Sequence, residues 1–283
     1  MLLVSQTQSS ETIAVHKFRR IIATWFLSIA LLLAGGLAAV PLAWMVWRSF
    51  IVLTPEGAAF SLNHYGELLS GQPSATWFAN SLFIAGAQTL IAAAACTLAG
   101  YVLAHHRVPY RRVWLGVLMA TLLLPSQVAL PASWQLMHKL HLLDSYLAML
   151  LPAGANVLGV FLFRHACRQI PPELLDAARI DGCGEFRIWW DVVLPVIQPT
   201  LVTFAVLSFT ANWNAYLWPQ IVLQDARKMT LAMGLANLSA LPQYRSDLGL
   251  MLAGTALSII PAFALFLAAR HSLESSITEG AVK

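Results

Sequence analysis

The sequence predicts an all-α membrane protein with six transmembrane helices. Of its 283 residues, 58% are hydrophobic and only 11% are charged, and the mean hydropathy is +0.68. One soluble core cannot bury that much apolar surface. A helix of roughly 20 apolar residues crosses a hydrocarbon layer about 30 Å thick, and the chain has six such runs. The predicted spans are approximately residues 21–47, 79–104, 113–136, 146–163, 197–221 and 250–269.

The first span follows a polar stretch, residues 1–20, which we interpret as a cytoplasmic N-terminal segment without chemistry of its own. The run at 21–47 is too long for the core of a signal peptide, and five more spans follow it. We therefore interpret it as a retained anchor. Residues 21–270 form the predicted transmembrane domain, and residues 271–283 form a cytoplasmic tail.

Turn-forming residues mark two longer segments between spans, residues 48–78 and 220–247. Both are predicted to lie on the outer side, the first as a modest folded loop. The second is long enough to reach an external partner, and a passive lid is the alternative for it. Spans three and four are also interrupted, and backbone left unpaired at membrane depth must be satisfied by protein or by a water-lined cavity. This favours a transporter over a simple anchor, although kinked helices also occur in bundles that transport nothing. The interrupting residues are Pro125, Pro131, Pro152 and Gly154.

Lysine and arginine residues predict the orientation, because cytoplasmic loops carry the excess of positive charge. Six spans place both termini on one side of the membrane. With the N-terminus inside, twelve of the seventeen Lys and Arg residues are cytoplasmic, whereas the opposite orientation reverses that ratio. The five predicted outside are Arg48, Lys139, Arg227, Lys228 and Arg245.

The cytoplasmic segment 171–195 is polar and yet has the pattern of two short helices. Two prolines at its start suit a first helical turn, and Glu173 and Asp176 place negative charge near the positive end of that helix. Asp181 and Gly182 then provide a stop, since glycine takes positive φ without a steric penalty. The segment is therefore predicted to be a helix, a sharp corner and a second helix.

The second of these helices is predicted to end at Pro195 and to turn Glu185, Arg187 and Asp191 away from one apolar face. A helix-corner-helix of this kind suits docking to another protein. The alternative is an amphipathic segment that lies on lipid. The predicted apolar face consists of Phe186, Trp189, Trp190, Val193 and Leu194.

The fifth span carries hydrogen-bonding side chains in an apolar run. Polar groups inside membranes usually face a bundle interior or a pathway. Asn212 and Tyr216 are four residues apart, so they are predicted to share a helix face, where an amide beside an aromatic ring could contact a sugar. Gln127 in the third span is a further candidate. The candidate pathway residues are thus Gln127, Asn212, Asn214 and Tyr216, and helix-to-helix hydrogen bonding is the alternative for them.

Several chemistries lack their motifs. The chain has no G-x-x-x-x-G-K-[ST] loop for ATP hydrolysis, no H-E-x-x-H zinc motif and no G-x-S-x-G nucleophile turn, so no catalytic or metal site is predicted. The predicted span interiors contain no acidic residue, which argues against a proton-coupled carrier. The three cysteines lack C-x-x-C spacing. The membrane topology explains the net charge of +4, so this charge does not by itself indicate nucleic-acid binding. The sequence also shows no basic face interleaved with aromatic residues.

Residues 176–195 resemble the cytoplasmic loop of ABC importer permeases. The pattern of that family is roughly E-A-A, three residues, G, nine residues and I-x-L-P, and here it reads D-A-A at 176–178, G at 182 and V-x-L-P at 192–195. FLFR at 161–164 and NWNAYLWP at 212–219 are typical of the carbohydrate-uptake branch, the maltose and glycerol-3-phosphate type. Asp176, Cys183 and Val192 depart from the usual Glu, Ala and Ile.

The resemblance implies a permease subunit in a bacterial inner (plasma) membrane, multi-pass, with both termini cytoplasmic. It implies as partners a second permease, two ATPase subunits that bind ATP and Mg²⁺, a periplasmic or extracellular solute-binding protein and membrane lipid, with no cofactor in this chain. The solute would be a sugar, a polyol or a sugar phosphate such as glycerol 3-phosphate. The implied ATPase-coupling residues are Glu173, Asp176, Ala177, Ala178, Arg179, Asp181 and Gly182.

Two other functions remain open from the residues themselves, an ion-coupled secondary carrier and a membrane-anchored assembly protein. The docking segment argues against both, because neither needs a cytoplasmic helix-corner-helix. In the importer, Gly182 would fix the corner, the small residues Ala177 and Ala178 would allow close packing in a groove of the ATPase, and Arg179 and Asp181 would offer polar contacts.

Overall fold

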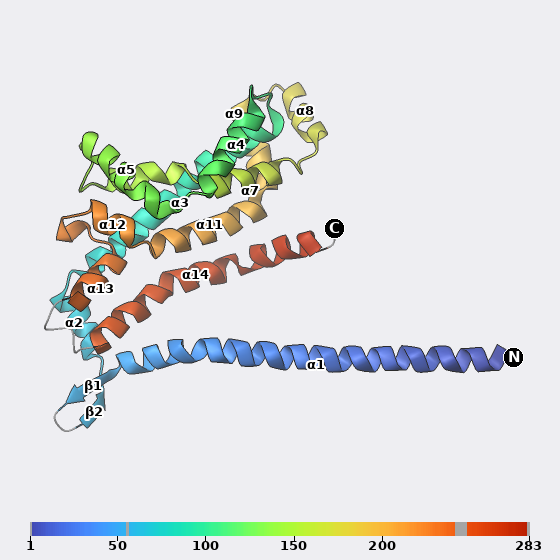
Figure 1. Ribbon diagram of the computed structural model, residues 1–283, viewed down its shortest axis with the longest axis horizontal. Helices are drawn as coiled ribbons and strands as arrows, with labels where there is room; N and C mark the ends of the chain where they lie inside the picture. The colour runs from blue at the N-terminus through green and yellow to red at the C-terminus, as the bar shows by residue number, and fades with distance from the viewer. Residues whose placement is uncertain (1, 55–56, 241–247, 282–283) are drawn as a thin grey trace.

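The computed structural model describes the backbone of residues 2–54, 57–240 and 248–281 and the side chains of residues 24–52, 57–125, 127–240 and 248–270. It is a helical bundle with one small hairpin (Figure 1). In chain order its elements are α1 (Leu2–Ser49), β1 (Ile51–Thr54), β2 (Gly57–Phe60), α2 (Asn63–Gly71), α3 (Ser74–His105), α4 (Arg111–Leu122), α5 (Ser126–Lys139), α6 (Tyr146–Leu150), η1 (Leu151–Gly154), α7 (Val157–Cys167), α8 (Pro172–Ile180), α9 (Glu185–Ile188), η2 (Trp189–Val193), α10 (Leu194–Val196), α11 (Gln198–Trp213), α12 (Leu217–Val222), η3 (Ala226–Lys228), α13 (Leu231–Ala240) and α14 (Leu248–Ala281).

Three helices of the described chain are long and apolar enough to cross a membrane unbroken, in α1, α3 and α14. Three further helix pairs pass the same test only together, with bends of 106° between α4 and α5, 41° between η1 and α7, and 82° between α10 and α11. If each bent pair is one crossing, the total is six, the number that the sequence predicts. The third pair begins inside the docking segment, so the predicted fifth span corresponds to α11 followed by α12.

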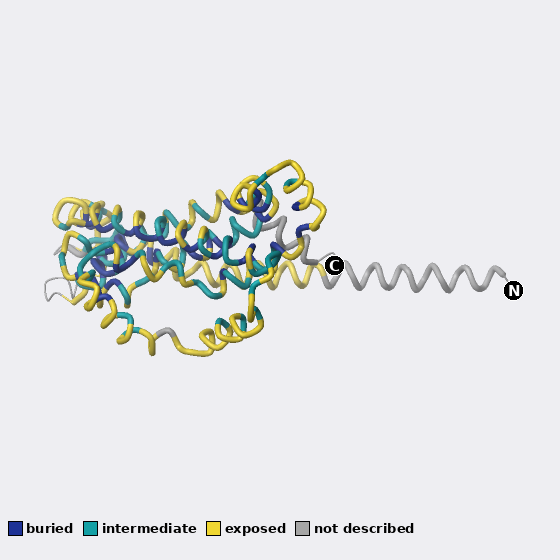
Figure 2. The backbone as a smooth tube through the Cα atoms, turned by 90° about the horizontal axis from the view of Figure 1, so that it is seen from above, coloured by how far each residue is buried: buried dark blue, intermediate teal, exposed yellow. Residues whose placement is uncertain are grey.

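The third predicted span, at 113–136, is interrupted, as Pro125 indicated in the sequence. The chain breaks between α4 and α5, where Pro125 is extended with φ −58° and ψ 131°. Proline lacks the N–H that a continuing helix needs and pushes the residue before it away from the helical region. Residues on both sides of the break are mostly exposed, as Figure 2 shows for α4 and α5.

The segment at 48–78 is folded, as the turn signals predicted, but it holds more secondary structure than a loop. Strands β1 and β2 pair antiparallel, with Ile51 opposite Phe60. The ring of Phe60 stacks on Phe50 with centroids 5.1 Å apart, and helix α2 then returns the chain to the bundle. The His64 ring nitrogen Nδ1 lies 2.9 Å from the carbonyl oxygen of Ser49, which ties α2 to the end of α1.

Helix α3 is the centre of the bundle and packs against α7 and α11. A Cβ atom added at Gly100 of α3 would lie 2.7 Å from the backbone nitrogen of Arg164 in α7. One added at Gly159 of α7 would lie 2.7 Å from the Phe204 ring of α11 and 2.8 Å from the Cys96 sulfur of α3. Small residues therefore let the three backbones approach, as in other membrane bundles.

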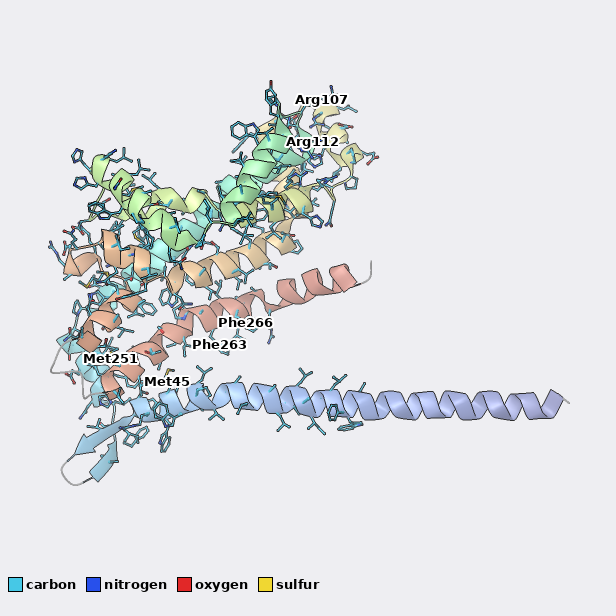
Figure 3. The ribbon with its side chains drawn as sticks, in the orientation of Figure 1. Met45, Arg107, Arg112, Met251, Phe263 and Phe266 are labelled. Carbon is cyan, nitrogen blue, oxygen red and sulfur yellow. The ribbon has the colours of Figure 1, made fainter. Side chains whose placement is uncertain are left out.

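The bundle has two distinct ends. The start of α4, the α8–α9 segment and both termini lie toward one end, and the hairpin, α2 and α13 lie at the other (Figure 1). Arg107 and Arg112 lie at the α8–α9 end (Figure 3). Helices α1 and α14 meet near Met45 and Met251 and then diverge along their length (Figure 3).

Candidate functional site

The corner after α8 is built as the sequence predicted. Helix α8 ends at Ile180, and Gly182 has φ +79°, the left-handed conformation that favours glycine. The Gly182 N–H donates to the Arg179 carbonyl and the Cys183 N–H donates to the Ala178 carbonyl, both at 3.0 Å. These two bonds define a Schellman motif, which satisfies the last carbonyls of a helix while turning the chain.

The apolar face predicted for the second helix is partly wrong. Ile188, Trp189 and Val193 are buried, whereas Phe186 and Trp190 are exposed. Residues Trp189–Val193 form a π-helical turn, so the side chains do not follow the regular 3.6-residue spacing on which the prediction depended. Nor does Pro195 end the helix, since α10 continues to Val196 and the sharp bend follows it.

A cluster of polar side chains, the brace, ties the corner to the end of α3. The Tyr101 hydroxyl donates to Glu185 Oε2 at 2.5 Å, and Arg179 Nε donates to Glu185 Oε1 at 3.0 Å. His106 Nε2 lies 3.2 Å from Glu185 Oε2, and Arg179 Nη1 also donates to Asp176 Oδ1 at 2.8 Å. The hydrogen bond with Glu185 is the main cause that raises the pKa of Arg179. The brace joins α3, α8 and α9 through one carboxylate.

The seven residues that the family pattern implied for coupling are not equivalent in the structure. Ala178 is half-buried and packs on the chain's own core together with Cys183. Arg179 and Asp176 belong to the brace, whereas Glu173, Ala177, Asp181 and Gly182 are exposed. The tip of α8 also exposes Ile180, with 87% of its surface accessible. An outward-facing apolar residue at a rigid corner is suited to contact with another protein.

A second feature is an open cavity of about 650 Å³ between the α4–α5 break and the helices that pack around α3. Its walls come from α3, the α4–α5 break, α6 with η1, the start of α7, α11 and α12. Among its polar lining residues are Gln88, Asn156, Ser208 and Asn212, and Trp218 adds an aromatic surface. Interrupted helices thus surround it, as expected where non-helical backbone lines a pathway.

The four predicted pathway residues are not brought together. Asn212 lines the cavity, and its amide nitrogen lies 3.4 Å from Ser208 Oγ. Gln127 lines a different hollow with Trp134. The expected shared face of Asn212 and Tyr216 is wrong, because α11 ends at Trp213 and Tyr216 precedes α12 in a non-helical conformation.

Asn214, the remaining pathway candidate, is exposed and donates from Nδ2 to the Thr210 carbonyl at 2.9 Å. Conversely, sequence reasoning missed Gln88, Tyr101 and Glu185. Gln88 had a usable signal, since it is an amide inside the apolar run of α3. The pairing of Tyr101 with Glu185 had none, because the two residues are 84 positions apart.

A protein-family comparison decides which kind of bundle this is. The model of the binding-protein-dependent transport system inner membrane components matches residues 96–276, a range that includes the corner, the brace and most of the cavity. The chain belongs to this family. It is accordingly a transport subunit and not an enzyme.

Curated relatives agree with this family. The arabinooligosaccharides transport system permease protein AraQ of Halalkalibacterium halodurans is 31% identical over 273 residues, which cover 93% of this chain and 97% of that protein. The sn-glycerol-3-phosphate transport system permease protein UgpE of Yersinia enterocolitica is 33% identical over 204 residues, which cover 72% of this chain and 73% of that protein.

Two solved structures are similar to this permease in fold. One is a bacterial ABC transporter involved in import of the acidic polysaccharide alginate, with a TM-score of 0.77, 21% identity and coverage of 88% of this chain and 96% of that one. The other is a bacterial alginate ABC transporter in complex with a periplasmic protein that holds an alginate pentasaccharide, with a TM-score of 0.63, 13% identity and coverage of 87% and 93%. Both structural similarities extend over nearly the whole of this permease.

The described part of the segment 220–247 is packed onto the bundle at the end opposite the corner. Trp77 Nε1 donates to the Ala226 carbonyl, and Asn80 donates to the carbonyls of Arg227 and Met229. Residues 241–247, at the end of this predicted outer segment, lie outside the described residues. The described part is therefore a fixed element of the permease.

Asp144 fastens the 140s loop to this segment. Its carboxylate accepts the N–H groups of Gln224 and Asp225, each at 3.0 Å, and lies 2.9 Å from Lys228 Nζ. The hydrogen bond from the Asp225 N–H, followed by that from Lys228, lowers the pKa of Asp144 to about 2. The carboxylate is thus charged at any physiological pH.

Proposed function

We propose that this permease forms half of the translocation pathway of an ABC importer for a carbohydrate-type solute. A second permease forms the other half, two ATPase subunits bind ATP and Mg²⁺, and a periplasmic or extracellular solute-binding protein delivers the solute. Both termini are cytoplasmic, on the same side as α8. The observation that carries the proposal is the rigid corner with exposed Ile180 at its tip, because a lever needs a fixed shape and a contact surface.

The brace gives the corner a mechanical connection to the bundle. When the ATPase subunits close around ATP, they displace α8, and the contact of Glu185 with Tyr101 transmits that displacement to α3. Helix α3 packs against α7 and α11, which line the cavity, so the cavity changes its access from one side to the other. The coupling is reciprocal in binding terms. A loaded binding protein that favours the outward-open state also favours the closed ATPase pair.

The relatives support a carbohydrate-type solute, since their names include arabinooligosaccharides and sn-glycerol 3-phosphate. An ion-coupled carrier would not need an ATPase-docking corner, and a membrane-anchored assembly protein would not need the cavity. These two features together favour the importer over both alternatives.

The test is purification of the permease from its native membrane in mild detergent, with mass spectrometry of the co-purifying proteins. We expect a phosphate-loop ATPase and a second multi-span permease. Ile180→Asp should weaken ATPase retention about 10- to 100-fold, since a buried isoleucine contributes about 1.5–3 kcal/mol. Leu62→Asp is the matched control, because Leu62 is also exposed but directly precedes α2, which lies at the other end of the bundle.

Recovery of the permease alone, or equal ATPase retention by the two variants, would contradict the docking role of α8. Transport by the purified permease alone in proteoliposomes under an ion gradient would instead support the secondary carrier.

A further inference from the structure

Three arginines converge where α4 begins and α7 ends. Arg111 is the first residue of α4, Arg164 lies in the last turn of α7, and Arg168 directly follows that helix. The two helices pack against each other, and the charges of Arg111 and Arg168 act electrostatically on Arg164. Like charges in such proximity repel each other. These three residues, the arginine cluster, are therefore held together at a cost in free energy.

The described part of the chain does not offset this cost. Among the described residues no carboxylate forms an ion pair with the arginine cluster, whereas Arg179, Arg187 and Arg227 each have an acidic partner. Arg164 Nε is also enclosed, and it has no hydrogen-bond partner within the described residues. A buried donor without an acceptor is a further cost. An anion from outside the chain would reduce the repulsion.

Such an anion can reach the cluster. Arg168 is exposed, and Arg111 and Arg164 are partly exposed. The enclosed Nε is thus not the expected contact. The contacts are instead expected from the exposed parts of the three side chains. Arginine is well suited to this, because its planar guanidinium group binds phosphate oxygens through paired, charge-assisted hydrogen bonds.

The backbone prevents the cluster from spreading apart. At Gly100 of α3 an added Cβ would lie 2.7 Å from the Arg164 backbone nitrogen, so α7 is pressed against α3 at this residue. The His105 Nε2 atom lies 2.7 Å from the Cys167 carbonyl oxygen, which fastens the end of α7 to the end of α3. A signal for membrane orientation needs positive charge on one side, but it does not need such convergence. The arrangement therefore calls for a binding role.

The surroundings of Arg111 identify the class of anion. The adjoining surface of α4 is apolar, with Val113, Trp114 and Val117 each more than half exposed, and Tyr110 just before the helix is 81% exposed. Tryptophan and tyrosine are enriched at membrane interfaces, where anionic headgroups attract arginine. A soluble anion would leave this apolar surface uncovered. A phospholipid covers both parts, with its phosphate on the arginines and its acyl chains along α4.

We infer that the arginine cluster binds the headgroup phosphate of an anionic phospholipid, such as phosphatidylglycerol, in the cytoplasmic leaflet. The inference goes beyond the proposed function and takes from it only the side of the membrane. A bound phosphate would stabilise the contact between α3 and α7. Tyr101 of the brace directly follows Gly100 in α3, so the lipid would also steady the part of α3 that holds the brace.

The test uses the complete importer in nanodiscs of phosphatidylcholine, with and without phosphatidylglycerol. Cys167 is the reporter, because it is fully buried next to Arg168 and reacts with maleimide only when the end of α7 opens. Its labelling on warming is read on its own peptide by mass spectrometry. Arg111→Gln is compared with Arg112→Gln, the matched control. Both variants lose one positive charge from the same helical turn, but Arg112 is exposed and is not among the charges that act on Arg164.

We expect phosphatidylglycerol to slow Cys167 labelling in the native permease. Arg111→Gln should need about tenfold more phosphatidylglycerol than Arg112→Gln for the same protection, the effect of one lost charge-assisted hydrogen bond. In phosphatidylcholine alone, Arg111→Gln should instead label more slowly than the native permease, because it removes repulsion within the cluster. A residue that only packs would not produce this reversal between the two lipids.

Equal shifts in the two arginine variants would show general attraction to a charged surface and would overturn the site, as would no effect of phosphatidylglycerol. Faster labelling of Arg111→Gln in both lipids would show that a carboxylate of a neighbouring subunit fills the cluster. Equal protection by inorganic phosphate in phosphatidylcholine would assign the cluster to a soluble anion. Either result would contradict the lipid. The labelling is read on this chain whether or not ATPase subunits co-purify with it, so failure of the importer proposal is scored separately.

Discussion

Replacing Gly182 by alanine places a Cβ atom on backbone with φ +79°. The new methyl group meets no atom of the chain within 4 Å, so the cost is conformational and not steric. A left-handed conformation costs an L-residue about 1–2 kcal/mol. Relaxing that conformation would break the two backbone hydrogen bonds of the Schellman motif, which together contribute about 2 kcal/mol.

The two free energies nearly cancel. In the native permease the relaxed corner is disfavoured by about 2 kcal/mol, and in Gly182→Ala this falls to about 0–1 kcal/mol. About a sixth to a half of the molecules should then lose the native corner. Valine, which is β-branched, should disrupt it more, and asparagine, which tolerates positive φ, should disrupt it less than alanine.

Transport per ATP hydrolysed in proteoliposomes that hold the complete importer is the appropriate measurement. We expect the order glycine, asparagine, alanine, valine, from best to worst coupling. Gly184→Ala is the matched control, because Gly184 lies two residues away with φ −71° and ψ 159° and an added Cβ there meets nothing within 4 Å. It should couple normally.

The comparison of asparagine with alanine decides between two explanations. If glycine were required only because it is small enough to fit against the ATPase, asparagine would be worse than alanine, since it is larger. That result, or normal coupling by Gly182→Val, would refute the reasoning from backbone conformation.

Three other predictions concern stability, coupling and acid sensitivity. Gly100→Ala should destabilise the permease by about 1–3 kcal/mol, because the new Cβ meets backbone that cannot move aside; thermal unfolding in nanodiscs measures this. Glu185→Gln removes the carboxylate charge that the half-exposed brace shares, which should weaken the brace by about 1 kcal/mol. Transport per ATP hydrolysed should fall as a result. Asp144 has a pKa depressed from 3.8 to about 2, so the stability that it gives the folded permease is complete above about pH 4 and is lost as the pH falls toward 2. Unfolding midpoints measured between pH 5 and pH 2 should show this loss.

Each has a control on the same chain. Gly86→Ala, also in α3 but with open space at its Cβ, should not destabilise, and equal loss in both glycine variants would contradict the close-approach argument. Asp191→Asn removes an exposed carboxylate that pairs with Arg187, outside the brace, and should leave coupling intact. Asp144→Asn should remove part of the acid sensitivity, and an unchanged pH profile in that variant would show that other carboxylates control it.

The corner and the interrupted spans could be predicted because their signals are local. The glycine stop depends on one backbone conformation, and Pro125 breaks a helix wherever it lies. The apolar face of the second docking helix could not be predicted correctly, because a π-helical turn changes the spacing and only packing against the core selects that turn. Similarly, Asn212 and Tyr216 have helical spacing in the sequence, but the helix between them ends.

The sequence by itself determined an all-α membrane protein, its family and the position of the docking corner, since hydropathy, helix stops and motif spacing are properties of neighbouring residues. Only the tertiary structure decided that Glu185 meets Tyr101 and that Gln88 shares a cavity with Asn212. The physical reason is that a polar side chain finds its partner by where the backbones cross. In this bundle glycines at the crossings of α3, α7 and α11 set that geometry.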